Sequence, residues 1–211
     1  MTKGFFITFE GADGSGKTTQ LNKIKDLLEE EGFDVVVTRE PGALLIGEKI
    51  REILLHHEEH IADRCEMFLF LADRAQHVEE FIKPALEEGK IVLCDRYTDS
   101  TIAYQGYGRN QNIKLLTDLN NIAINGMVPD LTLLFDVSTE TAMQRVGEEK
   151  DRMESIGADF HKRVRNGYLE LQRKEPERIK LINANNSIEN VYNNTKNIIL
   201  DLITHKEEKG V

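Results

Sequence analysis

The segment from Gly11 to Thr18 combines residue types and a spacing that can bind the phosphate groups of a nucleotide. It reads G-A-D-G-S-G-K-T and matches the pattern G-x-x-x-x-G-K-[ST]. In this pattern, backbone N–H groups and a helix N-terminus surround the phosphate oxygens, Lys17 reaches the β- and γ-phosphates, and Thr18 can coordinate Mg²⁺. The alternative is an ordinary glycine-rich turn, which is disfavoured because a β-like run precedes the segment and an amphipathic pattern follows it. The residues expected to bind the nucleotide are Gly11, Ala12, Asp13, Gly14, Ser15, Gly16, Lys17, Thr18 and Thr19.

The rest of the chain favours a small phosphotransferase among the proteins that carry this loop. A GTPase would need a base-reading N-K-x-D motif after a late strand, and the chain has Asn183-Ala-Asn-Asn there instead. A chain of 211 residues is also too short for a large motor ATPase. Phosphoryl transfer needs positioning and charge neutralisation more than a protein nucleophile, so no serine, cysteine or histidine base is required. A nucleotide-dependent switch with no acceptor substrate is the alternative from another class.

Apolar runs alternate with helical patterns along the chain, which predicts a mostly parallel sheet with helices on both faces. In the helix after the glycine-rich loop, Leu21, Ile24, Leu27 and Leu28 share one face. Ligands of such sheets bind beyond the carboxyl ends of the strands, so we expect the site there. The expected strands are 5–9, 35–38, 91–94, 131–137 and 179–182, and the expected helices include 46–56, 64–88, 139–147 and 158–174.

The composition excludes several classes of protein. Recurring apolar residues (40%) argue against disorder, and a net charge of −10 argues against bulk nucleic-acid binding, which needs a basic surface. No apolar run approaches the ~18 residues of a membrane span, and we expect no signal peptide, hence a cytoplasmic protein. The two cysteines, Cys65 and Cys94, are expected to be reduced and buried. We do not expect a metal site at His56, His57 and His60, which lie in a polar stretch.

Three further polar clusters follow apolar runs or lie in polar stretches: T-R-E-P-G at 38–42, D-R-Y-T-D-S-T-I-A-Y-Q-G at 95–106, and D-R-M-E at 151–154. Together with E-G-A-D-G-S-G-K-T-T they stand in the order found in thymidylate kinases, and the chain resembles that family from Gly4 to about Leu202. The resemblance implies an α/β P-loop nucleoside monophosphate kinase fold with a five-stranded parallel sheet, in a single domain over 1–211. It also implies transfer of the γ-phosphoryl group of ATP to dTMP, dependent on Mg²⁺, giving dTDP and ADP for dTTP synthesis. The alternative is a nucleoside or nucleoside monophosphate kinase with a different acceptor.

The same resemblance implies roles for residues that would read the thymine base. Phe70 would stack on the ring, Arg74 would donate to its O4, and Gln105 would pair with its N3. Without the resemblance, Phe70 would be interpreted as a core residue and Arg74 as a solvated charge. Ser100 and Thr101 would lie against the pyrimidine edge and its 5-methyl group, and their alternative role is to cap a helix.

The resemblance also implies how the phosphates are held. Arg39 and Arg96 would clamp the acceptor phosphate, because a guanidinium group presents a fixed planar fork. Arg51 is a weaker candidate, with a surface charge as its alternative. Asp13 would lie near the 3′-hydroxyl of dTMP, while Asp95 and Glu40 would organise Mg²⁺ waters and the arginines. The expected catalytic residues are Lys17, Arg96, Arg152, Asp13 and Glu40, and the expected metal ligands are Thr18 and Asp95.

A lid is expected at residues 148–157. Thymidylate kinases place a catalytic arginine in the phosphate loop or in the lid, and positions 12–15 hold none, which makes Arg152 the candidate. Arg145 would lie near the adenine or the phosphates. The chain departs from the family pattern at Ala43-Leu44-Leu45, so the conformation of that loop is not predicted. As in the family, we expect a homodimer formed through helices, the 64–88 helix foremost, with no nucleic-acid or membrane partner.

Overall fold

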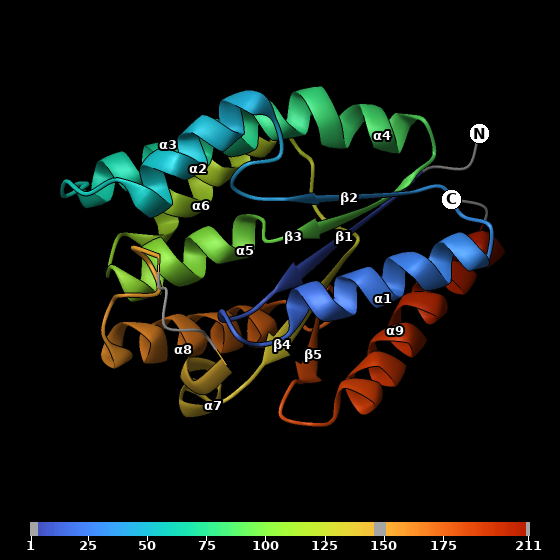
Figure 1. Cartoon of the computed structure of the whole chain (residues 1–211). Coiled ribbons are helices and arrows are strands. Elements are labelled where there is room, and N and C mark those ends of the chain that lie inside the picture. The colour runs from blue at the N-terminus through green and yellow to red at the C-terminus, as the bar shows by residue number, and fades with distance from the viewer. Residues whose placement is uncertain (1–3, 146–150, 210–211) are drawn as a thin grey trace.

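Within residues 4–145 and 151–209, which a computed structural model describes, five strands form one parallel sheet in the order β2-β3-β1-β4-β5 (Figure 1). The predicted fold class is therefore confirmed. Each strand begins at the residue expected from the sequence, and only the ends differ, by one residue. The strands are β1 (Phe5–Glu10), β2 (Val35–Arg39), β3 (Ile91–Asp95), β4 (Leu131–Asp136) and β5 (Ile179–Asn183).

The register brings the carboxyl ends of the three strands β2, β3 and β1 together. Arg39 of β2 pairs with Asp95 of β3, and Asp95 pairs in turn with Phe9 of β1. The polar clusters that follow these strands therefore gather at one edge of the sheet, where a parallel α/β sheet binds its ligand.

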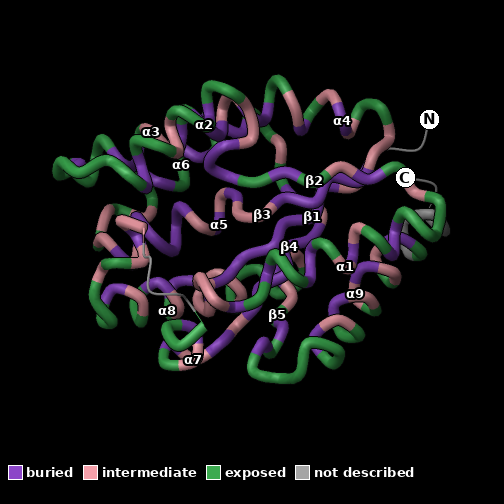
Figure 2. Tube along the Cα trace, viewed as in Figure 1, coloured by how far each residue is buried: buried purple, intermediate pink, exposed green. Residues whose placement is uncertain are grey.

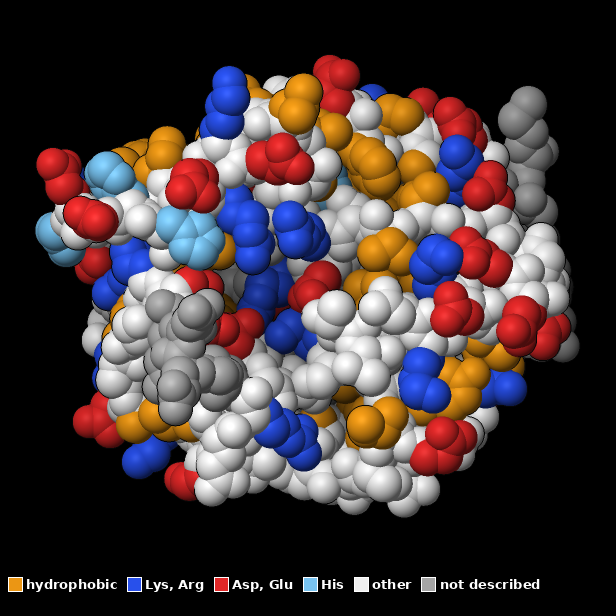
Figure 3. Space-filling view, in the orientation of Figure 1, with side chains coloured by type: hydrophobic (Ala, Val, Ile, Leu, Met, Phe, Trp, Pro, Cys, Tyr) orange, Lys and Arg blue, Asp and Glu red, His pale blue; other side chains and the backbone are white. Residues whose placement is uncertain are grey.

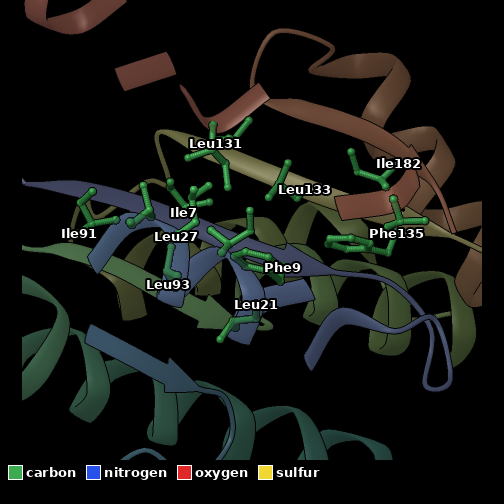
Figure 4. Packing of buried hydrophobic residues seen from close by; sticks show 14 of the residues in the cluster. Ile7, Phe9, Leu21, Leu27, Ile91, Leu93, Leu131, Leu133, Phe135 and Ile182 are labelled. Carbon is green, nitrogen blue, oxygen red and sulfur yellow. The ribbon is translucent and has the colours of Figure 1, made fainter. Parts of the chain in front are cut away.

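Two helices, α1 (Lys17–Glu30) and α9 (Ile188–Lys209), cover one face of the sheet (Figure 1). Alternate strand residues such as Ile7, Phe9 and Leu133 point toward them and pack with Leu21 and Leu27 (Figure 4). The predicted apolar face of α1 is buried, and the strands form the most buried part of the tube in Figure 2. This packing fixes the start of α1, and hence the glycine-rich loop, against the end of β1.

The opposite face is covered by the long helix and by helices that follow β3 and β4. Phe6, Val92 and Cys94 pack there against Val78 and Ile82, in the middle of the long helix. That helix is continuous, as predicted, and contains one π-helical segment. The elements on this side are α3 (Asp63–His77), η1 (Val78–Ile82), α4 (Lys83–Glu87), α5 (Thr98–Thr101), η2 (Ile102–Gly108), α6 (Ile113–Ile124) and α8 (Ala158–Lys174). The other two helices are α2 (Leu45–His56), which packs on α3, and α7 (Thr139–Arg145).

The fold tests the prediction that both cysteines are buried. Cys94 is buried, but the prediction for Cys65 was wrong: it is exposed, because it shares the outward face of α3 with Phe68 and Ala72. Among the described residues, no three histidine, cysteine or acidic side chains are placed to hold a metal ion. None of the described helices combines the length and apolar character that a bilayer crossing requires.

Candidate active site

The glycine-rich loop wraps around the amino end of α1. Gly11 has a φ of 136°, and a Cβ there would lie 2.4 Å from the carbonyl oxygen of Phe135, so only glycine fits. The Nζ atom of Lys17 crosses the loop and donates to the carbonyl oxygens of Gly11 and Ala12 at 3.1 and 3.0 Å. Burial, and then the charge of Arg96, lower the pKa of Lys17. An anion bound in the loop would offset both effects, because it would stabilise the charged form of Lys17.

The side chains of Thr18 and Asp95 meet at the end of β3. The Thr18 hydroxyl donates to Asp95 Oδ2 at 3.2 Å, whereas Asp95 Oδ1 is buried and has no hydrogen-bond partner among the described residues. An unpartnered carboxylate oxygen beside a hydroxyl oxygen is the donor set that Mg²⁺ prefers. The residues present therefore fit a magnesium ion.

A large cavity of about 750 Å³ lies over the loop, and a narrower one continues from it. The first, the loop cavity, is lined by residues that include Lys17, Thr18, Thr19, Arg39 and Asp95. The second, the inner cavity, is lined by residues that include Phe70, Arg74, Ser100, Thr101 and Gln105. Among the described residues, four line both cavities: Asp13, Glu40, Arg51 and Arg96. The structure thus brings the nucleotide loop and the predicted base-reading residues to two sides of one charged junction.

Arginines dominate that junction. Figure 3 shows Lys and Arg side chains gathered around the hollow in this face of the molecule. Burial and the neighbouring charge of Arg39 lower the pKa of Arg51, whose Nη1 donates to the Pro41 carbonyl at 3.0 Å. Arg51 is therefore partly buried in the lining of both cavities and is not a free surface charge. Guanidinium groups held this close together form a binding site for a phosphate.

Arg96 and Asp13 form an ion pair across the junction. Arg96 Nη2 donates to Asp13 Oδ1 at 2.6 Å, and its Nη1 donates to the Gly11 carbonyl at 3.0 Å. Burial alone would raise the pKa of Asp13, but the charges of Arg96 and Lys17 and its hydrogen bonds hold it below the usual value. Asp13 is therefore ionised at neutral pH and orients the guanidinium of Arg96.

The base-reading residues lie at the far end of the inner cavity. Phe70 is half-buried on its wall, and Gln105 is almost fully buried, with its Nε2 donating to Glu66 Oε1 at 3.0 Å. Ser100 and Thr101 lie inside α5, whose N-cap is Tyr97, so the alternative that they cap this helix was wrong. The Ser100 hydroxyl donates to Glu10 Oε2 at 2.6 Å.

Arg74 is the largest fully buried side chain of the described chain, so its interpretation as a solvated charge was wrong. Its Nε donates to Glu40 Oε2 at 2.8 Å, and its Nη1 donates to Thr101 Oγ1 and Asn120 Oδ1, both at 2.7 Å. Its Nη2 donates to the Tyr97 carbonyl at 2.9 Å, so one of its five N–H groups has no hydrogen bond to the described residues. The other oxygen of Glu40 contacts His77 Nδ1 at 2.9 Å.

The lid arginine lies away from the phosphate loop in this structure. Arg152 donates to the Leu54 carbonyl at 2.7 Å and to Glu66 Oε2 at 2.7 Å, and it is not among the residues that line either cavity. Residues 148–150 of the expected lid lie outside the described residues, and 151–157 form turns. Glu154 of this segment lines the loop cavity. Arg145 donates to the Gly14 carbonyl at 3.4 Å, next to the loop.

Three buried acids of the site were missed by the sequence analysis. Glu10 accepts from the Tyr97 backbone at 2.7 Å, and burial, followed by the charge of Asp99, raises its pKa to about 7. Glu66 and Asp73 are buried on α3. A signal was available, since each acid borders an apolar run, and Glu66 precedes Phe70 by four residues on the same helical face.

A parallel sheet with a phosphate loop after β1, joined to a second cavity lined by Arg51, Arg74 and Arg96, defines a P-loop nucleoside monophosphate kinase. The sequence profile of the thymidylate kinase family matches residues 9–195. A thymidylate kinase of Desulfovibrio desulfuricans is 48% identical over 196 residues, covering 88% of this chain and 90% of its own. One from an Exiguobacterium species is 47% identical over 210 residues, covering 98% and 97%.

The crystal structure of the thymidylate kinase of Ehrlichia chaffeensis superposes with a TM-score of 0.79 at 37% identity, covering 94% of this chain and 99% of that one. The chain belongs to the thymidylate kinase family. It is accordingly a phosphotransferase that acts on a nucleoside monophosphate.

Proposed function

We propose that this chain carries out the reaction of its family, the transfer of the γ-phosphoryl group of ATP to dTMP to give dTDP and ADP, at the junction of its two cavities. The observation that carries the proposal is that Asp13, Glu40, Arg51 and Arg96 line both cavities. ATP enters on the loop side and dTMP on the inner side. Their phosphates then meet where the arginines neutralise the charge of both.

The inner cavity recognises dTMP. Phe70 stacks on thymine, Gln105 pairs with N3, and the free N–H of Arg74 faces O4, while Ser100 and Thr101 border the ring edge. Arg39, Arg51 and Arg96 bind the acceptor phosphate, and Asp13 lies near the 3′-hydroxyl. Glu40 acts by holding Arg74, as its 2.8 Å ion pair supports. The acceptor oxygen of dTMP is already ionised near pH 7, so no general base is needed.

The loop cavity binds ATP through residues 11–19. Lys17 leaves the carbonyl oxygens of the loop and contacts the β- and γ-phosphates, and Arg145 lies beside the nucleotide. Arg152 supplies the additional positive charge at the transferred group. Because Arg152 now pairs with Glu66, that contact must break before its guanidinium reaches the phosphates.

Thr18 and Asp95 would hold a magnesium ion, as the unpartnered Asp95 Oδ1 supports. The ion would neutralise charge on the ATP phosphates. The same residues orient one another without it, through the 3.2 Å hydrogen bond.

The chain acts as one domain in the cytoplasm, as a homodimer, and without a nucleic-acid or membrane partner. Exposed apolar side chains on three neighbouring helices support the dimer, since such patches mark contact surfaces. They are Leu45, Ile46 and Ile53 of α2, Phe68 of α3, and Leu115 and Ile122 of α6. Light scattering at micromolar concentration should give twice the mass of one chain, and the mass of one chain would contradict the dimer.

Coupled ADP release with dTMP, dUMP, dCMP and thymidine tests the acceptor assignment. We expect the highest kcat/KM with dTMP and none above background with thymidine, which lacks the acceptor phosphate. ATP hydrolysis unaffected by any nucleotide would instead indicate a switch. A preference for dCMP would indicate a kinase with another acceptor.

A further inference from the structure

Glu66 is a completely buried carboxylate beside the base end of the inner cavity. Its Oε1 accepts from Gln105 Nε2 at 3.0 Å and from Arg109 Nε at 3.3 Å. Its Oε2 accepts from Arg109 Nη2 at 3.0 Å and from Arg152 Nη2 at 2.7 Å. All four contacts come from N–H donors, so both oxygens act only as acceptors.

The charge of Glu66 is fixed by these partners. Burial opposes ionisation, but the hydrogen bonds from Arg109, Gln105 and Arg152 hold the pKa of Glu66 below its usual value. An ionised carboxylate has no proton to donate. It therefore requires the NH₂ group of Gln105 on its own side, and the amide oxygen of Gln105 is turned away from it.

We propose that Glu66 is a positioning residue that locks the Gln105 carboxamide with its carbonyl oxygen toward the acceptor base, and so selects bases that carry a proton on N3. This inference rests on the proposed role of Gln105 in reading the base. Thymine and uracil carry an N3–H that donates to a carbonyl oxygen. Cytosine presents an unprotonated N3, which would face the same oxygen, acceptor against acceptor.

The reversed amide is excluded by the same contacts. Rotating the Gln105 carboxamide by half a turn would break the hydrogen bond from its Nε2 to Glu66 Oε1. The amide oxygen of Gln105 would then lie against that carboxylate oxygen. Two buried acceptors in contact are costly, because no proton lies between them and no solvent screens their repulsion. Gln105 cannot relax into solvent, because it is only 1% exposed.

The test compares dUMP with dCMP, which differ only in the base edge, through the ratio of their kcat/KM values. The wild-type chain should prefer dUMP by at least about a hundredfold, because a site built for a hydrogen bond rejects a base that cannot make it. Comparable activity on both would overturn the inference. Glu66→Gln keeps the size of the side chain but can donate as well as accept. It should lower the ratio at least about tenfold.

Two controls isolate the mechanism. Asp63→Asn removes another acid of α3 that pairs with Arg109, at 3.7 Å, without a contact to Gln105, and should leave the ratio unchanged. Gln105→Leu should itself lower the ratio, and adding Glu66→Gln to it should cause no further fall, because Glu66 acts through Gln105.

The outcomes separate the inference from the function on which it rests. If Gln105→Leu leaves the ratio unchanged, the proposed role of Gln105 fails. If Gln105→Leu lowers the ratio and Glu66→Gln does not, the role of Glu66 alone is overturned. Should Glu66→Gln not fold, Glu66→Asp retains the charge but withdraws the carboxylate by one methylene. The ratio should fall in that variant too, and an unchanged ratio would overturn the inference.

Discussion

Replacing Asp73 with asparagine should stabilise the protein, and more so at alkaline than at acid pH. Asp73 is buried on α3 next to the loop that follows β2. Its Oδ1 accepts from the Gly42 backbone N–H at 3.1 Å, and its Oδ2 has no hydrogen-bond partner in the part of the chain that the structure describes. Asparagine can keep the first contact through its own Oδ1 and carries no charge.

The magnitude follows from the ionisation of the buried carboxyl. Burial, and then the charge of Glu40, raise the pKa of Asp73 from 3.8 to about 6, against the opposing effects of the Gly42 N–H, His77 and Arg74. The folded chain binds this proton more tightly than the unfolded chain. The contribution of the protonated Asp73 carboxyl to stability is therefore fully present below pH 3.8 and is lost as the pH rises through 6. A pKa difference of about two units corresponds to about 3 kcal/mol in the free energy of unfolding, and about half of this amount is lost by pH 5.

Urea unfolding of the wild-type chain and of Asp73→Asn at pH 5 and pH 8 is the assay. The gain in the free energy of unfolding at pH 8 should exceed the gain at pH 5 by about 1–2 kcal/mol, because fixed packing effects of the new amide cancel between the two pH values. Asp26→Asn, on the exposed side of α1, is the control and should show no such difference. Equal effects of Asp73→Asn at both pH values would refute the reasoning.

The remaining predictions concern the reaction. Lys17→Ala should reduce kcat far more than dTMP affinity, and near-normal turnover in the ADP assay would remove Lys17 from the chemistry. Asp95→Asn should raise the Mg²⁺ concentration needed for half-maximal rate, measured by titration, and an unchanged requirement would place the ion elsewhere. Gln105→Leu should weaken dTMP binding by about 1–3 kcal/mol in calorimetry and leave ATP binding unchanged; equal losses would mean a structural role. Arg152→Ala should lower kcat at least about tenfold with little effect on dTMP affinity, whereas a change confined to dTMP affinity would show that Arg152 acts only through Glu66.

The fold and the phosphate loop could be predicted because their signals are local. Strands such as Ile91–Asp95 are continuous apolar runs, and the pattern around Lys17 places a known loop between a strand and a helix. The predicted strands differ from the observed ones only at their carboxyl ends, by one residue each. There the polar residues Glu10, Arg39 and Asp95 continue the ladder with main-chain pairs that do not depend on side-chain type.

The inner cavity could not be predicted from residue types alone. Arg74 on an isolated helix is a typical solvated charge, and its burial depends on Glu40, Tyr97 and Asn120, which are distant in sequence. The resemblance to a family supplied Arg74 and Gln105 as candidates. It did not supply Glu66, which holds Gln105, or Asp73, which holds the loop after β2. These contacts form only when α3 packs against other elements.

The buried acids explain how a chain of net charge −10 can bind two phosphorylated substrates. Two of the arginines that face the cavities are each held by a carboxylate, since Asp13 pairs with Arg96 and Glu40 pairs with Arg74. These ion pairs fix the guanidinium groups before a substrate arrives. Fewer side chains must then be ordered when the phosphates of ATP and dTMP are brought together.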